Sequence, residues 1–262
     1  MNTKESARTR SEVTKFFVLF LTFSLLLILP GLNGFSEEPV NFPDENLEQA
    51  IRDAIDKPSG EIYPSDLEGL TELNAENNGI ENLSGIEYCK DLTHLDLGEY
   101  ESSNKIKDIS PLANLTRLIR LDLKYQNVSN LGPISNLTKL ERLYLRGNDI
   151  TNIDQLSELI NLTHLNLAEN QITNISSLSN LTNLRDLVLT HNNVSEIQPL
   201  SNLTNLEDLI LYNNKISSID ALSDLTNLKQ LNVGNNNLKD FSSIANFTKL
   251  EILGLEYMFL AK

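Results

Sequence analysis

Residues 162–183 read LTHLNLAENQITNISSLSNLTN, and the same 22-residue frame recurs along most of the chain. Eight full units and one partial unit occupy residues 70–262, and they start at Leu70, Leu92, Leu118, Leu140, Leu162, Leu184, Leu206, Leu228 and Leu250. Successive starts are 22 residues apart, except that four extra residues fall around Glu99 to Ser102 in the second unit. Self-similarity at such a period is typical of a solenoid, in which each unit packs on its neighbours.

The apolar residues of a unit stand at positions 1, 4, 6, 11, 14, 17 and 20, counted from its first leucine. Positions 4 and 6 alternate with polar residues, which is the spacing of a strand. Positions 11 to 20 recur every three residues, which suits 3-10 or extended turns better than an α-helix. Pro111, Pro133 and Pro199 all stand at position 16 and also oppose a regular helix. Each unit is therefore predicted to form one short strand and a tight return, and stacked units pair their strands into a parallel sheet.

An amide side chain recurs at position 9, where the turn after each strand is expected. Asparagine stands there in most units, and glutamine once, at Gln126. A side-chain amide both donates and accepts hydrogen bonds, so we expect it to satisfy backbone groups in its own unit and the next. Gln126 predicts a slightly looser turn. The asparagines are Asn78, Asn104, Asn148, Asn170, Asn192, Asn214 and Asn236.

Residues 1–36 differ in kind from the repeats. A basic start up to Lys15 precedes an apolar run from Phe16 to Leu29, and small residues follow, which is the organisation of an export signal. The run is short for a membrane span, which needs about 20 residues. The segment is interpreted as a signal peptide or an N-terminal membrane anchor, and the positive-inside rule puts the rest of the chain outside in both cases. Membrane contact is expected only through this segment, if it stays uncleaved.

Residues 37–69 are predicted to form a small helical cap over the first unit. Pro43 suits the first position of a helix, and Asp44 beside it favours the positive end of the helix dipole. Ser65 and Glu68 have the spacing of a capping box for a second short helix.

The repeats resemble the 22-residue leucine-rich repeats of the internalin family of bacterial surface proteins, over Asn41 to about Leu255. The resemblance rests on the pattern LxxLxLxxNxIxxIxxLxxL. It implies an α/β solenoid, a right-handed superhelix with short parallel strands on the concave face, a 3-10 or irregular convex side and a small helical N-terminal cap. Internalins usually continue into an immunoglobulin-like domain and a cell-wall attachment segment, from which the end of this sequence departs. Either the last apolar residues fold over the core or the chain is a truncated product.

Several function classes are disfavoured. A net charge of -15 repels phosphate backbones, so nucleic acid is not an expected partner. The sequence lacks the phosphate-loop, metalloprotease and nucleophile-elbow motifs, so no enzyme and no cofactor is predicted. Cys89 stands at position 20, a core position, and His94, His164 and His191 are spaced too widely for a predicted metal site.

The predicted binding surface is the row of residues at positions 3, 5, 7 and 8, which are expected to point away from the core onto the concave face. Basic residues gather there in the third and fourth units, and apolar residues in the sixth and seventh. Tyrosine and arginine are the usual anchors of protein interfaces, which favours Tyr144 and Tyr212 as anchors. Scattered surface variation is the alternative interpretation. The candidate partner-binding residues are Arg120, Lys124, Arg142, Tyr144, Arg146, His164, Asp186, Val188, Asp208, Ile210 and Tyr212.

Three functions follow from this pattern. The first is a secreted or cell-surface protein that recognises another protein through its concave face, as the resemblance to internalins implies. The second is a structural envelope or spacer protein without a specific ligand. The third is a phosphatase-regulating subunit, because an intracellular family of that kind has a similar repeat, although the export segment opposes it.

Overall fold

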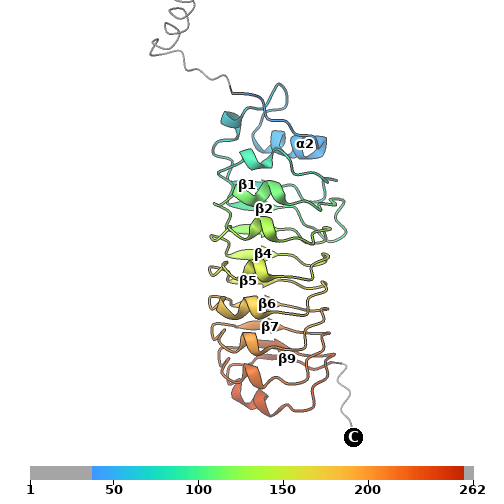
Figure 1. The fold of residues 1–262 in the computed structure, drawn as a ribbon, viewed down its shortest axis with the longest axis vertical. Coiled ribbons are helices and arrows are strands. Elements are labelled where there is room, and N and C mark those ends of the chain that lie inside the picture. Colours follow the sequence, from blue (N-terminus) through green and yellow to red (C-terminus); the bar gives the residue numbers. More distant parts are fainter. Residues whose placement is uncertain (1–36, 257–262) are drawn as a thin grey trace, which may run out of the picture. The chain divides into compact units, whose positions relative to one another are not determined.

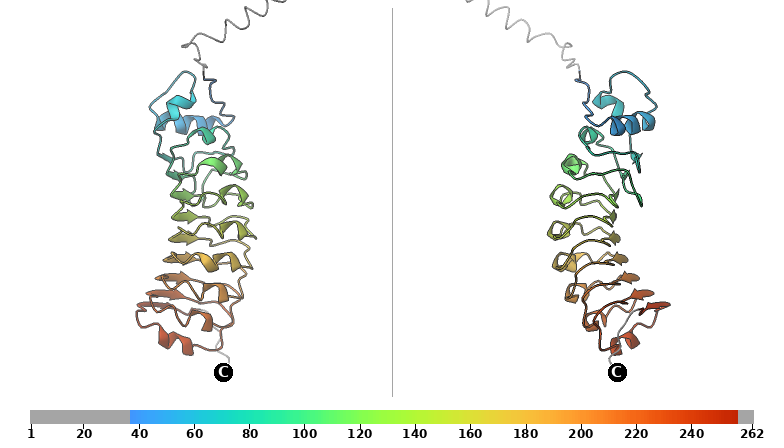
Figure 2. Two further views of the ribbon diagram at one scale, coloured as in Figure 1. Left: turned by 60° about the vertical axis from the view of Figure 1, so that its left-hand side comes forward. Right: turned by 90° about the vertical axis from the view of Figure 1, so that its right-hand side faces the viewer.

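Residues 37–256 are described by a computed structural model. From Pro39 onward, the cap and then the repeat units stack in chain order (Figure 1), with the strands on one side and the tight returns on the other (Figure 2, right). The nine strands form one sheet in the order β1 to β9, and every neighbouring pair is parallel. Figure 2 shows that the stack curves toward the strands, which makes the sheet the concave face. This confirms the predicted solenoid.

Each strand is three residues long with a central leucine, which is buried in β1 to β8 and 38% exposed in β9. The side chains on either side of that leucine point toward solvent to different extents. The register places equivalent residues of successive units opposite each other, for example His164 and Asp186. The strands are β1 (Glu72–Asn74), β2 (His94–Asp96), β3 (Arg120–Asp122), β4 (Arg142–Tyr144), β5 (His164–Asn166), β6 (Asp186–Val188), β7 (Asp208–Ile210), β8 (Gln230–Asn232) and β9 (Ile252–Gly254).

The convex side is built from short 3-10 helices, as the three-residue spacing predicts. Proline stands in the first turn of several of them, where its missing N–H costs no hydrogen bond. After η1 in the cap, these helices are η2 (Ile86–Tyr88), η3 (Ser110–Asn114), η4 (Gly132–Ile134), η5 (Asp154–Leu156), η6 (Ser176–Asn180), η7 (Gln198–Leu200), η8 (Asp220–Leu222) and η9 (Ser242–Asn246).

The core is one continuous stack of leucine, isoleucine and valine. In the fifth unit, Leu162, Leu167 and Ile172 are fully buried, and the equivalent residues of the neighbouring units pack above and below them. Burial of one such side chain contributes about 1.5–3 kcal/mol. Cys89 is also fully buried, which confirms its predicted place in the core.

The position 9 amides form a buried ladder, but its direction differs from the prediction. Asn148 donates to Leu145 O of its own unit at 3.0 Å and to Leu123 O of the preceding unit at 2.8 Å. Its Oδ1 accepts from Val128 N, also of the preceding unit. Each amide therefore ties its unit to the one before it and not to the next.

Two members of the ladder depart from the pattern. Asn78 is exposed, because the cap and not another repeat precedes its unit. Gln126 reaches Leu97 O of the preceding unit at 3.3 Å, compared with 2.8 Å for the equivalent bond of Asn148. Within its own turn, Gln126 donates to Lys124 O at 3.0 Å, compared with 3.4 Å for the equivalent bond of Asn148, so the looser turn at Gln126 stays a prediction.

The cap contains helix α2 (Glu45–Ala54) and the 3-10 helix η1 (Pro64–Leu67). Leu47, Ala50 and Ile51 of α2 are buried against the first unit. The predicted start at Pro43 is wrong by two residues, because the Asp44 side chain caps the helix by accepting from Asn46 N and Leu47 N.

The capping box predicted for Ser65 and Glu68 is also wrong. Its acidic member is Asp66, whose carboxylate accepts from Tyr63 N at 2.7 Å. Glu68 lies beyond η1 with extended backbone. The predicted export segment in residues 1–36 and the last apolar residues, 257–262, lie outside the described residues.

Candidate functional site

The concave face presents the residues at positions 3 and 5 of each unit. Because the strands are in register, the position 3 residues form one row across the sheet and the position 5 residues form a second. All the predicted site residues on strands lie in these two rows. Lys124, Arg146 and Tyr212 follow at position 7, just after their strands.

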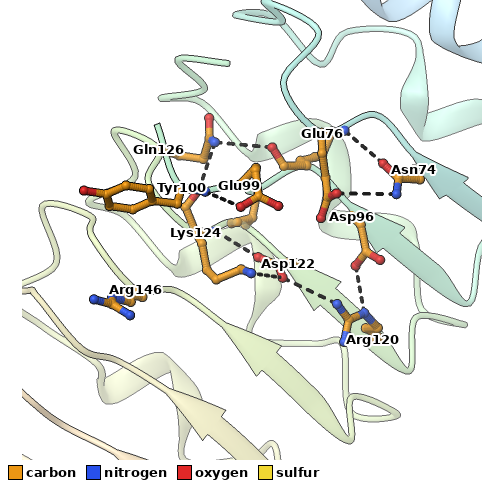
Figure 3. A network of polar contacts seen from close by, with 12 residues as sticks. Asn74, Glu76, Asp96, Glu99, Tyr100, Arg120, Asp122, Lys124, Gln126 and Arg146 are labelled. Carbon is orange, nitrogen blue, oxygen red and sulfur yellow. Dashed lines mark hydrogen bonds and ion pairs between the residues drawn. The ribbon is translucent and has the colours of Figure 1, made fainter. Parts of the chain in front are cut away.

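The basic residues of the third unit are not free cations. Arg120 Nε donates to Asp96 Oδ1 at 2.8 Å, and Lys124 Nζ lies 3.1 Å from Asp122 Oδ2 (Figure 3). The Arg120 guanidinium also stacks over the Tyr144 ring, 4.8 Å from its centroid. The basic residues of this unit are therefore neutralised by acidic neighbours, Asp96 on the adjacent strand β2 and Asp122 on β3 itself.

Position 5 residues were predicted to point onto the concave face, and this prediction is wrong for Asp122. Its side chain is buried, with 1% of its residue surface exposed, and its Oδ1 accepts from Lys124 N at 3.1 Å. Gly98 of the preceding unit makes room for this side chain. A Cβ at Gly98 would lie 2.7 Å from Asp122 Oδ1 and would also collide with the Lys124 backbone. Burial raises the pKa of Asp122 to about 6, although Lys124 opposes the shift.

The basic residues of the fourth unit differ in exposure. Arg146 is half-buried and binds Glu169 through two nitrogens, at 2.6 and 3.2 Å. Arg142 is exposed. Within residues 37–256 it is in no ion pair, so it is the available cation of the predicted site.

The fifth to seventh units contribute an acidic group. His164 Nε2 lies 2.8 Å from Asp186 Oδ2. Asp208 stands directly opposite Asp186 on the next strand. Burial and the neighbouring Asp186 carboxylate raise the pKa of Asp208.

The apolar residues of the sixth and seventh units lie side by side. Val188 and Ile210 are register partners on β6 and β7, and both are half-buried. Tyr212 packs edge-on against the His191 ring, with 5.6 Å between centroids. The structure thus brings the predicted apolar cluster together, next to the acidic pair.

The predicted site residues include neither of two tyrosines beside this surface, although Tyr125 stands at position 8 of its unit. Tyr100 lies in the four-residue insertion with 65% of its surface exposed, and its ring packs edge-on against Tyr125 at 5.2 Å. The Arg146 guanidinium lies over the Tyr125 ring. Figure 3 shows Tyr100 projecting from its loop. The insertion itself was the signal, because extra residues in one unit of a regular repeat form a loop.

Across residues 37–256, no group of histidine, cysteine, aspartate or glutamate side chains has the arrangement of a metal site. Burial raises the pKa of the Cys89 thiol to about 12, which opposes a nucleophilic role. No helix in the same range is long and apolar enough to cross a membrane.

A curved parallel sheet, convex 3-10 helices and a buried asparagine ladder define a leucine-rich-repeat protein. The family model for leucine-rich repeats in two copies matches residues 68–114, 160–202 and 204–246. A comparison with curated protein sequences found no match.

Solved structures give a narrower assignment. Internalin C2 of Listeria monocytogenes is 37% identical, with a TM-score of 0.80 over 84% of this chain and 98% of that one. Internalin F of the same species is 29% identical, with a TM-score of 0.56 over 85% of this chain and 79% of that one. The chain belongs to the internalin family of leucine-rich-repeat proteins.

A more distant match comes from a plant. The leucine-rich-repeat ectodomain of the membrane receptor kinase GASSHO1/SCHENGEN3 of Arabidopsis thaliana is 25% identical, with a TM-score of 0.60. The match covers 67% of this chain and 22% of that one, and that structure is a complex with CASPARIAN STRIP INTEGRITY FACTOR 2. The internalin-like repeat fold is typically a non-enzymatic scaffold for binding proteins, which supports a role in protein interaction.

Proposed function

We propose that this protein is exported and recognises another protein at a cell surface through its concave face. The observation that carries the proposal is the placement of Val188, Ile210 and Tyr212, which are partly exposed on a sheet whose fold does not require apolar residues there. Tyr144 lies two strands away in the same row as Val188, on the face that also carries Arg142. Tyrosine and arginine are common anchors of interfaces.

Binding can be tested with a variant in which Tyr144, Ile210 and Tyr212 are all changed to serine. The labelled chain and the variant are applied to an array of extracellular protein domains. We expect the triple variant to lose the targets that the native chain binds, since apolar anchors in the centre of an interface dominate affinity.

A matched control changes Tyr88 and Ile160 to serine. Both are exposed and lie outside the strands, with 42% and 51% of their surface accessible. This control is expected to bind as the native chain does. Unchanged binding by the triple variant contradicts recognition through the concave face and leaves a spacer role as the better explanation.

Export is tested separately, in the cells that make the protein. Membrane, envelope and medium fractions are collected and the intact mass of the chain is measured in each. A product cleaved near residue 36 outside the membrane supports secretion, and a full-length product in the membrane supports surface display. A full-length product in the cytosol contradicts export and favours the regulatory alternative.

A further inference from the structure

The position 3 row of the concave face changes sign along the solenoid. From β3 to β7 it reads Arg120, Arg142, His164, Asp186 and Asp208, and each residue stands opposite the next. A charged row on a solvent-facing sheet is not needed by the core, which the central leucines form. The core therefore does not account for the order of charges in this row, in which the cations come first and the carboxylates last.

Arg142 is the free positive charge of the row. Its neighbour Arg120 is held by Asp96, and Arg146 by Glu169. Arg142 itself is exposed, and in the part of the chain that the structure describes it has no acidic partner. A guanidinium presents several donors in a planar fork that matches a carboxylate. Arg142 is thus set to receive an acidic side chain.

Asp186 and Asp208 are the negative charges of the row, and among the described residues neither is ion-paired with a lysine or an arginine. Asp208 belongs to no ion pair in that range, and the ion pair of Asp186 is with the imidazole of His164. The two carboxyl groups stand opposite each other, and burial together with repulsion by Asp186 raises the pKa of Asp208. A cation placed between them removes that repulsion.

The apolar residues beside these carboxylates indicate which kind of cation could bind between them. Val188 and Ile210 are the position 5 residues of the same two strands, so they lie beside Asp186 and Asp208. Lysine and arginine carry an aliphatic stem that packs on apolar surface while the charged group reaches a polar partner. A simple metal ion or small ammonium group leaves the apolar row unused.

We propose that this face binds an extended segment of a partner protein that carries one basic and one acidic side chain. The basic group lies between Asp186 and Asp208 with its stem on Val188 and Ile210, and the acidic group lies on Arg142. This inference rests on the proposed function and names the chemistry of its partner.

The sheet also sets the spacing of the two charges. From β4 to the midpoint of β6 and β7 the row crosses two to three strand steps of about 4.8 Å, or about 12 Å in all. An extended chain advances about 3.3 Å per residue. The acidic and basic residues are therefore expected to lie about four residues apart in the partner.

A random 12-residue peptide library displayed on phage provides the probe. It is selected on the full chain and on two variants, Arg142→Gln and the double variant Asp186→Asn with Asp208→Asn. The native chain is expected to enrich peptides with an acidic and a basic residue about four positions apart. The arginine variant loses the acidic enrichment alone, and the aspartate variant loses the basic enrichment alone.

A matched control removes two acidic charges elsewhere, with Asp149→Asn and Asp154→Asn. Both residues are exposed and lie outside the strands. This control is expected to select the same peptides as the native chain, and far-UV circular dichroism checks that every variant is folded. A synthetic copy of a selected peptide is expected to bind about tenfold more weakly to either charge variant, since each variant removes charge-assisted hydrogen bonds to the peptide.

Three outcomes overturn the inference. Peptides that lack paired charges, yet lose binding when Ile210 and Tyr212 become serine, contradict the charge assignment and leave the proposed function intact. Equal selection by the native chain and both charge variants places the binding elsewhere. A library that yields no binder also counts against the inference, and the domain array then decides the proposed function independently.

Discussion

Replacing Asn170 by alanine tests whether the buried amide ladder holds the units together. Asn170 Oδ1 accepts from Ile150 N at 3.0 Å, and Nδ2 donates to Leu145 O at 2.9 Å, both in the preceding unit. Nδ2 also donates to Leu167 O of its own unit at 3.1 Å. Alanine cannot replace any of these bonds. Since Asn170 is only 7% exposed, water cannot readily take its place.

The magnitude follows from the one group left without a partner and from the bonds lost beside it. Ile150 N becomes unsatisfied in the interior, which costs about 1–3 kcal/mol, whereas Leu145 O keeps Asn148 Nδ2 as a donor. We expect the free energy of unfolding to fall by about 3 kcal/mol. Urea denaturation followed by far-UV circular dichroism measures it, and an unchanged dependence on denaturant shows that the same cooperative unit unfolds.

Asn78 provides the matched control, because it occupies the same repeat position with an exposed side chain. Asn78→Ala is expected to change the free energy of unfolding by less than about 0.5 kcal/mol. A loss at Asn170 below about 1 kcal/mol, or one equal to that at Asn78, refutes the ladder as a major source of stability.

Three further predictions concern single side chains. Asp122→Asn is expected to stabilise the fold by about 3 kcal/mol at pH 7, because burial raises the pKa of this carboxyl from 3.8 to about 6 and one unit corresponds to about 1.36 kcal/mol. The folded state holds this proton more tightly than the unfolded chain, so the advantage of the variant, measured by thermal unfolding, should grow from about pH 4 to pH 6 and then level off. Gly147→Ala should lower the free energy of unfolding by about 1–2 kcal/mol in urea, since Gly147 has a φ of 70° and a Cβ there meets the Tyr125 ring; an unchanged midpoint contradicts this. Cys89, buried and with its pKa raised to about 12, should react with iodoacetamide at pH 8 only after denaturation, and labelling of the folded chain opposes its burial.

The backbone fold of this protein could be predicted from the sequence because each repeat unit contains the same pattern of apolar residues. A leucine at position 4 and an apolar residue at position 6 have the spacing of a strand in every unit, so one ambiguous unit is corrected by its neighbours. The cap had no such redundancy. Its helix starts at Glu45 because Asp44 accepts two backbone N–H groups, which competes successfully with the preference of Pro43 for a first helical position.

The sequence predicted which residues lie on the candidate site, but it did not predict which of their charges are neutralised by ion pairs. Position in the repeat placed Arg120 and Lys124 on the concave side, and the structure agrees. The partner of Arg120, Asp96, lies on the adjacent strand and depends on register between units, whereas Asp122 stands two residues before Lys124 in the space that Gly98 leaves. The predicted site was a set of basic and apolar positions without the acidic neighbours Asp96 and Asp122, so it did not show that most of the basic cluster is ion-paired.

The same register explains why the remaining free charges are informative. Each side chain on a strand meets the equivalent side chain of the next unit, so compensation within the sheet requires opposite charges in adjacent units. The charge of Arg120 is compensated by Asp96 on the adjacent strand, whereas Asp208 faces Asp186, which has the same charge. Like charges directly opposite each other are unfavourable in an isolated sheet. A bound cation converts this unfavourable pair into a favourable contact, which is why the acidic end of the row is the stronger half of the proposed recognition surface.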